Sequence, residues 1–99
     1  MSTLSSIALS GLRAAQETAR ASAHNLANLN TDGYRRVEVT QQAMAEGGVD
    51  SQARRAALPG SALAQDVVDQ LKARNAFLAN LAVFRSADRM AGALIDVKA

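Results

Sequence analysis

Small and apolar residues recur every three or four positions along the first third of the chain. Spacings of four and three residues separate the members of one row: Ala8, Leu12, Ala15, Ala19, Ser22, Leu26 and Leu29. This is the heptad period of a helix that packs along a single seam. The pattern predicts a helix from Leu4 to about Leu29, which ends where Asn28–Gly33 supplies residues that favour turns.

The last third of the chain has a second helical pattern. It starts at Ser61, a residue type that caps helices, and continues to about Val97. Apolar side chains recur there in columns of seven residues: Val67, Leu81 and Ile95, then Leu71 and Leu78, then Phe77, Phe84 and Ala91. Charged residues interrupt these columns, so we expect a long amphipathic helix with an imperfect seam.

The middle of the chain, residues 35–60, has no comparable period. Arg36–Thr40 alternates and predicts one short extended piece, whereas Gln41–Glu46 has a helical composition, and the pairs Gly47-Gly48 and Pro59-Gly60 break any element. We therefore expect an all-α fold, in which two long terminal helices pair as an antiparallel coiled-coil hairpin with a short irregular or partly extended middle connector. One domain would comprise three segments: 1–34, the N-terminal helix and Asn-rich turn; 35–60, a flexible connector or arm; and 61–99, the C-terminal helix.

Composition limits how much core such a chain can build. The chain has 99 residues, of which 48% are hydrophobic, but about a fifth of all residues are Ala. Leu, Ile, Val and Phe together make up only roughly 22% of the chain. This fraction is just above the level below which chains tend to be disordered. A two-helix hairpin of this composition is marginal as a monomer. We hypothesise that the helices order fully only when they pack against other copies or related chains.

Charge and hydropathy narrow the range of partners. The formal net charge is +2, which is weak support for a nucleic-acid partner. The basic pairs Arg35-Arg36 and Arg54-Arg55 are either solvated charge on the connector or contacts to an acidic partner surface, and they lack the interleaved aromatic residues typical of nucleic-acid binding. No apolar run reaches the roughly 18 residues of a membrane span, and the first residues lack the pattern of a cleaved secretory signal. We expect no membrane insertion.

The sequence gives little support for a catalytic or metal-binding site. His24 is the only His, and the sequence shows no Ser or Asp partner for it. Asp66 and Asp69 lie at the start of the second predicted helix, where they complement the helix dipole. The run from Asn28 to Val39 has the length of a calcium loop, but it begins with Asn and ends with Val where Glu is required. The chain has no Cys. We expect no enzymatic activity, no cofactor and no bound metal.

Two stretches of the chain form recognisable motifs. The first is Ile7-Ala8-Leu9-Ser10-Gly11-Leu12-Arg13-Ala14-Ala15-Gln16, followed by Ala23-His24-Asn25-Leu26-Ala27-Asn28-Leu29-Asn30-Thr31-Asp32-Gly33-Tyr34. It resembles the N-terminal signature of the bacterial flagellar axial proteins, the family of rod, hook and hook-associated proteins, with Asn-Leu-Ala-Asn-x-Asn-Thr-x-Gly-Tyr as its core. The second stretch, comprising Asp66–Leu71, Phe77–Asn80 and Phe84–Met90, resembles the C-terminal helix of that family.

This resemblance implies a structural role in the periplasm-spanning rod of the flagellar basal body. Such proteins pair their terminal helices, stack with other axial subunits or with themselves into a tube, and leave through the flagellar type III export apparatus without a cleaved signal peptide. The implied helix-packing residues are Ala8, Leu12, Ala15, Ala19, Leu26, Leu71, Leu78, Leu81 and Phe84. The implied turn residues are Asn25, Asn28, Asn30, Thr31, Gly33 and Tyr34. The middle segment is too short for the large outer domains of hook or distal rod proteins, which favours a short rod subunit.

Two other functions stay open at this point. A non-flagellar helical adaptor or oligomeric scaffold would keep the helical ends without entering a flagellum, and unimpaired motility after loss of the protein would favour it. A small basic regulator would bind nucleic acid with a strong dependence on salt concentration.

Overall fold

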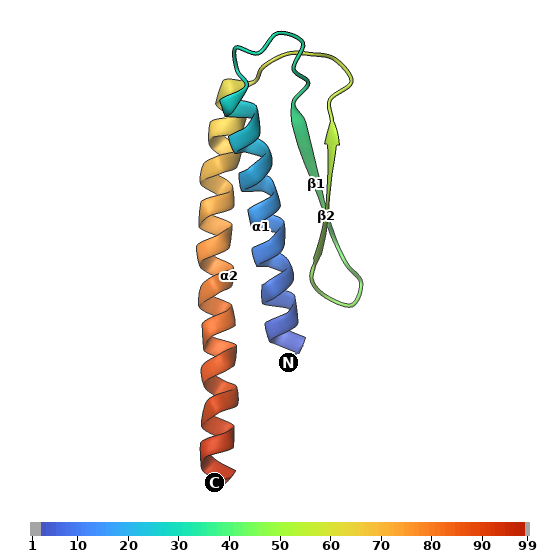
Figure 1. Ribbon diagram of the computed structural model, residues 1–99. Coiled ribbons are helices and arrows are strands. Elements are labelled where there is room, and N and C mark those ends of the chain that lie inside the picture. Colours follow the sequence, from blue (N-terminus) through green and yellow to red (C-terminus); the bar gives the residue numbers. More distant parts are fainter. Residues whose placement is uncertain (1–2, 99) are drawn as a thin grey trace.

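The computed structural model describes residues 3–98, with side chains described for residues 3–95. Residues 1, 2 and 99, which the predicted segments include, lie outside this range. Four elements follow one another along the chain: α1 (Thr3–Ala27), β1 (Val37–Ala43), β2 (Val49–Arg55) and α2 (Leu63–Lys98). The molecule measures 62 × 24 × 15 Å, because both helices run along its long axis (Figure 1).

The prediction of an all-α fold is wrong, because the middle of the chain forms a two-stranded antiparallel sheet. The alternation in Arg36–Thr40 does indicate a strand, but β1 continues to Ala43, through residues whose composition suggests a helix. The second strand has the sequence VDSQARR, in which only the first residue is a β-branched apolar one. Its pairing with β1 therefore overrides a weak local preference.

Residues 44–48 join the two strands, and Ala45-Glu46-Gly47 forms a three-residue turn at their centre. The amide of Met44 donates to the carbonyl of Gly48, and the amide of Gly47 donates to the carbonyl of Met44, both at 3.0 Å. Gly47 has a φ of 95°, a left-handed conformation that glycine adopts without a steric cost. A glycine in this conformation at the third position is typical of three-residue hairpin loops. The two glycines predicted as a break thus lie in the connection of a hairpin, Gly47 in the turn and Gly48 next to it.

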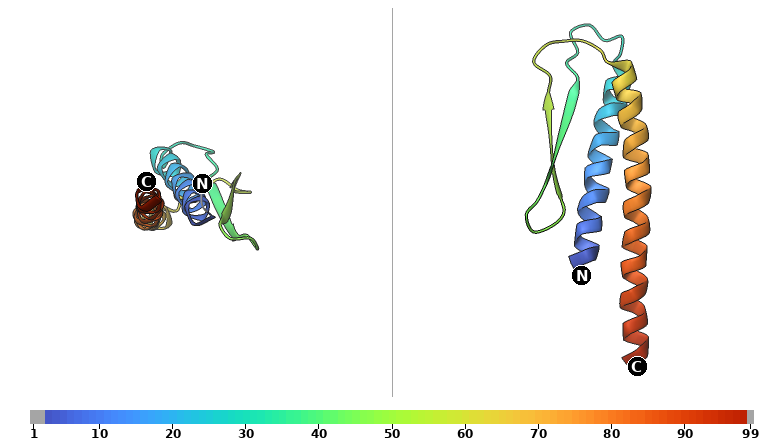
Figure 2. Two further views of the ribbon diagram at one scale, coloured as in Figure 1. Left: turned by 90° about the horizontal axis from the view of Figure 1, so that it is seen from below. Right: turned by 180° about the vertical axis from the view of Figure 1, so that it is seen from behind.

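Helix α1 lies between α2 and the hairpin. The view from below shows the three in a row, with α2 and the hairpin on different sides of α1 (Figure 2). The two helices run antiparallel (Figure 1). The pairing of the strands extends from Val37 with Arg55 to Ala43 with Val49.

Two faces of α1 account for this central position. Ser10, Thr18 and Asn25 hydrogen-bond to the hairpin, and their spacings of eight and seven residues place them on one face of the helix. Ala15 and Ser22, seven residues apart, are buried on a second face, where Ser22 hydrogen-bonds to Gln70 of α2. Both faces carry small side chains, so both neighbours approach α1 closely.

The face of α2 that meets α1 is one residue away from the predicted column of Leu71 and Leu78. The residues of α2 that contact α1 or are buried follow spacings of three, four and seven: Asp66, Gln70, Ala73, Asn80 and Ala87. Leu71 and Leu78 are consequently turned outward and are 55% and 52% exposed.

The ends of the helices differ slightly from the predicted ones. Helix α1 ends at Ala27, two residues before Leu29. Helix α2 begins at Leu63, and the carbonyl of Ala62 accepts the amide of Asp66 at 2.9 Å. The prediction that Ser61 caps this helix is therefore wrong, since Ala62 holds the cap position.

Helix α2 continues past the start of α1. The contacts of Asn25 with Asp66 and of Gly11 with Asn80 fix the register of the pair, which brings Thr3 opposite Asp88. The turns of α2 beyond that point, about 15 Å at a rise of about 1.5 Å per residue, have no described element beside them (Figure 1). We call residues 89–98 the overhang.

Candidate functional site

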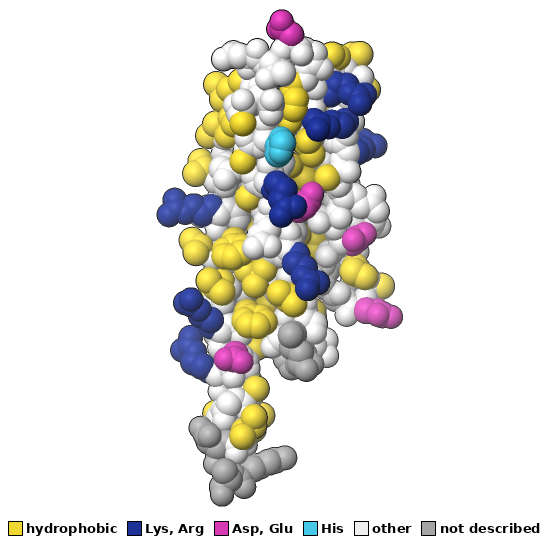
Figure 3. Space-filling view, viewed as in Figure 1, with side chains coloured by type: hydrophobic (Ala, Val, Ile, Leu, Met, Phe, Trp, Pro, Cys, Tyr) yellow, Lys and Arg dark blue, Asp and Glu magenta, His cyan; other side chains and the backbone are white. Residues whose placement is uncertain are grey.

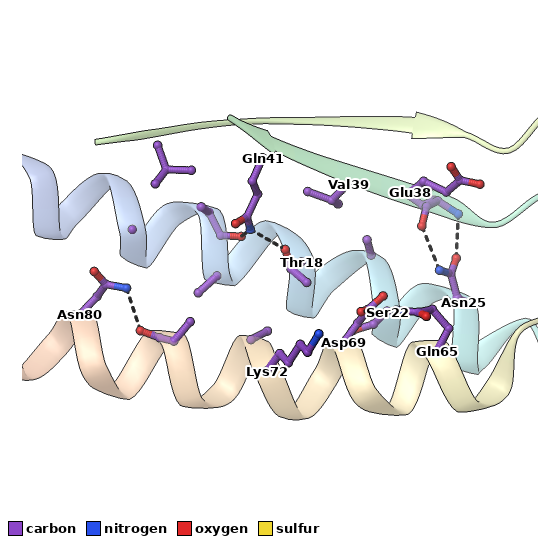
Figure 4. A pocket seen from close by; sticks show the side chains of 18 of the residues that line it. Thr18, Ser22, Asn25, Glu38, Val39, Gln41, Gln65, Asp69, Lys72 and Asn80 are labelled. Atoms are coloured by element: carbon purple, nitrogen blue, oxygen red, sulfur yellow. Dashed lines mark hydrogen bonds between the residues drawn. The ribbon is translucent and has the colours of Figure 1, made fainter. Parts of the chain in front are cut away.

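The side chain of Asn25 binds the start of β1 as a neighbouring strand would. Its Nδ2 donates to the carbonyl of Val37 at 2.9 Å, and its Oδ1 accepts the amide of Val37 at 2.8 Å (Figure 4). The amide of Ala56 donates to the carbonyl of Arg36 at 2.8 Å, so the backbone groups of Arg36 face the second strand. Because successive residues of an antiparallel strand alternate in this respect, the backbone N–H and C=O of Val37 point away from β2. Asn25 is only 3% exposed and satisfies both of these groups.

A buried ion pair connects the same site to α2. Asp66 lies in the first turn of α2 and is 1% exposed. Arg36 donates to it through Nε, 3.2 Å from Oδ2, and through Nη2, 2.5 Å from Oδ1, while Asn25 donates to Oδ1 at 3.0 Å. The hydrogen bond to Asp66 raises the pKa of Arg36 above its ordinary value, so the guanidinium stays charged. A buried carboxylate requires such a partner, and Arg36 supplies it.

Tyr34 closes this site from the loop that follows α1. Its hydroxyl donates to Oδ1 of Asn25 at 3.1 Å, and the guanidinium of Arg55 lies 5.2 Å from the centre of its ring. Oδ1 of Asn25 thus accepts two hydrogen bonds, one from a side chain and one from the backbone. We call the cluster of these residues the polar junction: Asn25, Tyr34, Arg36, Val37 and Asp66.

The other residues predicted to shape the turn lie in the same loop but outside the polar junction. Nδ2 of Asn28 donates to the carbonyl of His24 at 2.9 Å, and the hydroxyl of Thr31 lies 3.1 Å from Oδ1 of Asn28. Gly33 has a φ of 73°, and Asn30 is exposed. These residues end the helix locally, whereas Asn25 and Tyr34 connect three elements.

Further hydrogen bonds attach the hairpin to α1. Nε2 of Gln41 donates to the hydroxyl of Thr18 at 2.9 Å (Figure 4). Nearer the turn, the amide of Val49 donates to Oγ of Ser10 at 3.1 Å. A Cβ on Gly48 would lie 2.9 Å from the same oxygen, so this close approach depends on glycine. Hydrogen bonds therefore attach the hairpin to α1 at the start of β1, in its middle and beside the turn.

Sequence reasoning missed the partners of the polar junction. It assigned Asp66 to the helix dipole and left Arg36 either solvated or on a partner surface, because the two residues are far apart in the chain. Only the buried position of Asp66 beside Asn25 reveals the pair. The single signal was the motif that already contains Asn25 and Tyr34.

Small residues form the buried core of the molecule, including the contact between the two helices. Among the described residues, the buried apolar side chains are all alanines: Ala8, Ala14, Ala15, Ala21, Ala73 and Ala87. Gly11 permits the approach of Asn80, since a Cβ there would lie 2.6 Å from the Asn80 Cγ. Such an interface allows close packing but buries little apolar area per residue.

The residues predicted to pack the helices fall into three groups. Ala8 and Ala15 are buried between the helices, whereas Leu71 and Leu78 are more than half exposed. The rest are partly buried: Leu12, Ala19, Leu26, Leu81 and Phe84. Packing of the exposed leucines against neighbouring chains stays a prediction.

Many bulky apolar side chains lie on the outside of the helix pair. Between 37% and 67% of each of the following is exposed: Leu4, Ile7, Leu63, Val67, Val68, Leu71, Leu78, Val83, Met90, Leu94 and Ile95. We call these the outward apolar residues. Figure 3 shows apolar patches along one face of the two helices. Exposed patches of this kind mark surfaces that bind partners.

Two hollows lie along α1. A trough of 660 Å³ runs over α1 between the hairpin and α2, and its side chains do not converge on a single point (Figure 4). A groove of 380 Å³ is formed by the two helices alone. Residues 3–98 contain no group of three His, Cys, Asp or Glu placed to hold a metal ion. Neither described helix is both long and apolar enough to cross a bilayer.

Comparison with known proteins found no relative: no family model matches the chain, and no curated protein matches it.

Proposed function

We propose that the chain is a structural subunit of the bacterial flagellar basal-body rod, which assembles by helix packing into the axial tube. The observation that carries this proposal is the reversed distribution of side-chain size. Among the described residues, the buried apolar side chains are alanines, whereas the outward apolar residues lie on the surface of the helix pair. Bulky apolar side chains are normally the most buried residues of a domain. A subunit that packs against neighbours on several sides would bury them.

The free energy available from such assembly is large. Full burial of a Leu, Ile or Val side chain contributes about 1.5–3 kcal/mol, so covering its exposed half contributes about 1 kcal/mol. Eleven outward apolar residues would together contribute on the order of 10 kcal/mol per subunit. That is comparable to the whole stability of a typical small domain.

The polar junction supports the same proposal. Asn25 and Tyr34 belong to the motif that resembles the axial family, and both hold the hairpin against the end of α1. A fixed hairpin would present a constant shape to neighbouring subunits. The overhang would extend each subunit toward the next one along the axis. The subunit acts by packing alone, with other axial subunits or further copies as its partners, and reaches the periplasm through the flagellar type III export apparatus.

Motility of bacteria that carry a single substitution tests this proposal. Leu78 is 52% exposed and Leu58, in the loop before α2, is 78% exposed. We expect Leu78→Asp to abolish swimming and to leave basal bodies without a complete rod in electron micrographs. Leu58→Asp introduces the same charge away from the helices, and we expect it to leave motility unchanged. Circular dichroism of both purified variants would check that the helices form.

Normal swimming by cells that lack the protein would refute the flagellar role. If the purified protein still assembled into particles in that case, an oligomeric scaffold outside the flagellum would be the better interpretation. Assembly of the Leu78→Asp variant into normal rods would refute packing through this face of α2.

A further inference from the structure

The groove formed by the two helices has an apolar floor. Apolar side chains of both helices line it: Ala15 and Ala19 of α1, and Leu71, Ala73, Phe77 and Leu78 of α2. Gln16, Gln70 and Arg74 complete the lining. No hairpin residue contributes to the lining, so the groove is open along the helix pair. Leu71 and Leu78 are half exposed here and have apolar surface left to cover.

Arginines lie along both rims of this groove. Arg74 lines the groove itself on the side of α2, and Arg85 lies seven residues after Leu78, on the same face of that helix. On α1, Arg13 and Arg20 lie three residues before and four residues after Gln16, which also lines the groove. Figure 3 shows basic side chains on either side of the apolar patch over α1 and α2.

Few acidic groups offset these arginines. Glu17 lies 3.8 Å from Arg20 and compensates it in part. Asp88 lies farther along α2, next to a further basic residue, Arg89. The rims therefore keep an excess of positive charge around an apolar floor.

A second copy of this chain does not supply the complementary charge. The acidic residue of α1 is Glu17 alone, and it lies between Arg13 and Arg20. The end of α2 brings Arg85 and Arg89 together with Asp88. Placing α1 or the end of α2 from a second copy in the groove would set arginines against arginines, which disfavours that pairing. At the start of α2, Asp66 is buried, and Asp69 lies three residues before Lys72.

We propose that this groove binds an amphipathic helix of a different protein, whose apolar stripe is flanked on both sides by Asp or Glu. The apolar stripe covers Leu71, Phe77 and Leu78, and the acidic side chains pair with the arginines of the rims. This inference goes beyond the proposed function, because it concerns the free chain and states the charge pattern of the partner that the groove binds.

Binding of a designed peptide tests the proposal on the purified full chain. The probe is a fluorescein-labelled helix of about 18 residues, long enough to span about 27 Å, with Leu along one stripe and Glu on both flanks. One control peptide has Lys in place of every Glu, and another has the same composition with the Leu residues scattered around the helix. We expect fluorescence anisotropy to show binding of the Glu peptide that is about tenfold tighter than that of either control and that weakens as salt is raised.

Two variants locate the binding surface. We expect Arg74→Glu to weaken binding of the Glu peptide by about tenfold, and Arg54→Glu, an equal charge change on the hairpin, to leave it unchanged. Equal binding of the Glu and Lys peptides by the wild-type chain would overturn the proposal, and so would an unchanged affinity in Arg74→Glu. Sedimentation of the protein alone gives a further outcome: a dimer that Arg74→Glu alters would assign the groove to a second copy instead. These results do not depend on motility, so they are separate from the test of the proposed function.

Discussion

Replacing Asn25 with alanine removes the residue on which the polar junction depends. The side chain takes part in four hydrogen bonds: two with the backbone of Val37, one from the Tyr34 hydroxyl and one to Asp66. Helix α1 itself should tolerate the change, because alanine is the strongest helix former. The effect therefore isolates the contact between α1, the hairpin and α2.

The expected magnitude follows from these four contacts. A hydrogen bond within a protein contributes about 0.5–1.5 kcal/mol, and leaving a buried polar group unpaired costs more. Water can reach Val37, which is half-buried, and Asp66 keeps both hydrogen bonds from Arg36. We therefore expect Asn25→Ala to lower the free energy of unfolding by about 3 kcal/mol.

Urea denaturation followed by circular dichroism at the helical band measures this change, at a protein concentration where the chain is monomeric. Asn75→Ala is the matched control, because Asn75 is exposed on α2, and we expect it to change the unfolding free energy by less than about 0.5 kcal/mol. Limited trypsin digestion reports on the hairpin, since Arg54 and Arg55 lie in β2. Asn25→Ala should be cleaved there faster than the wild type under native conditions.

A loss of less than about 1 kcal/mol in Asn25→Ala would refute this reasoning, because it would mean that the hydrogen bonds of the junction are replaced by water without cost. Unchanged cleavage in β2 would show that the hairpin is held by other contacts.

The remaining predictions concern two glycines and the buried ion pair. Gly48→Ala should lower the melting temperature, because residue 48 has a φ of 95° and the new Cβ would lie 2.9 Å from Ser10, whereas Gly92→Ala in α2 meets no atom within 4 Å and should raise helicity, with a gain of about 0.5–1 kcal/mol. Differential scanning calorimetry of the pair checks both signs. Arg36→Ala should cost about 3–5 kcal/mol, since it leaves Asp66 buried without its cation. Because the pKa of Arg36 is raised by Asp66, the stabilisation from its charge is present below the ordinary arginine pKa and is lost only above the raised one. Urea denaturation at several pH values should therefore show that Arg36→Ala lowers the free energy of unfolding by the same amount from about pH 7 to pH 10.

The helices could be predicted from the sequence because each repeats its pattern over many turns. On α1, the predicted row includes Ala8, Ala15 and Ser22, which are all buried in the structure. On α2, the prediction favoured the large apolar residues Leu71 and Leu78, and the structure instead buries small residues on the adjacent face, such as Ala73. Size is a misleading guide in a chain whose helices approach closely through alanine and glycine.

The sheet and the polar junction could not be predicted for a different reason. β2 lacks an apolar alternation, and its position is determined by its pairing with β1 and by the turn at Gly47. Arg36 and Asp66 come together only after the hairpin is placed against α1. Contacts of this kind join distant parts of the chain, and the periodicity of apolar residues in any one segment does not predict them.

The alanine contact between α1 and α2 has a mechanical consequence. Methyl groups present a nearly flat surface, so they resist separation of the helices but interlock little against sliding along the common axis. The bonds that oppose such sliding are polar and cluster toward one end of the pair, at Asn25 with Asp66 and at Ser22 with Gln70. A force that pulls α2 along its axis would therefore act first on these few hydrogen bonds. The two helices would begin to slide only after those hydrogen bonds break.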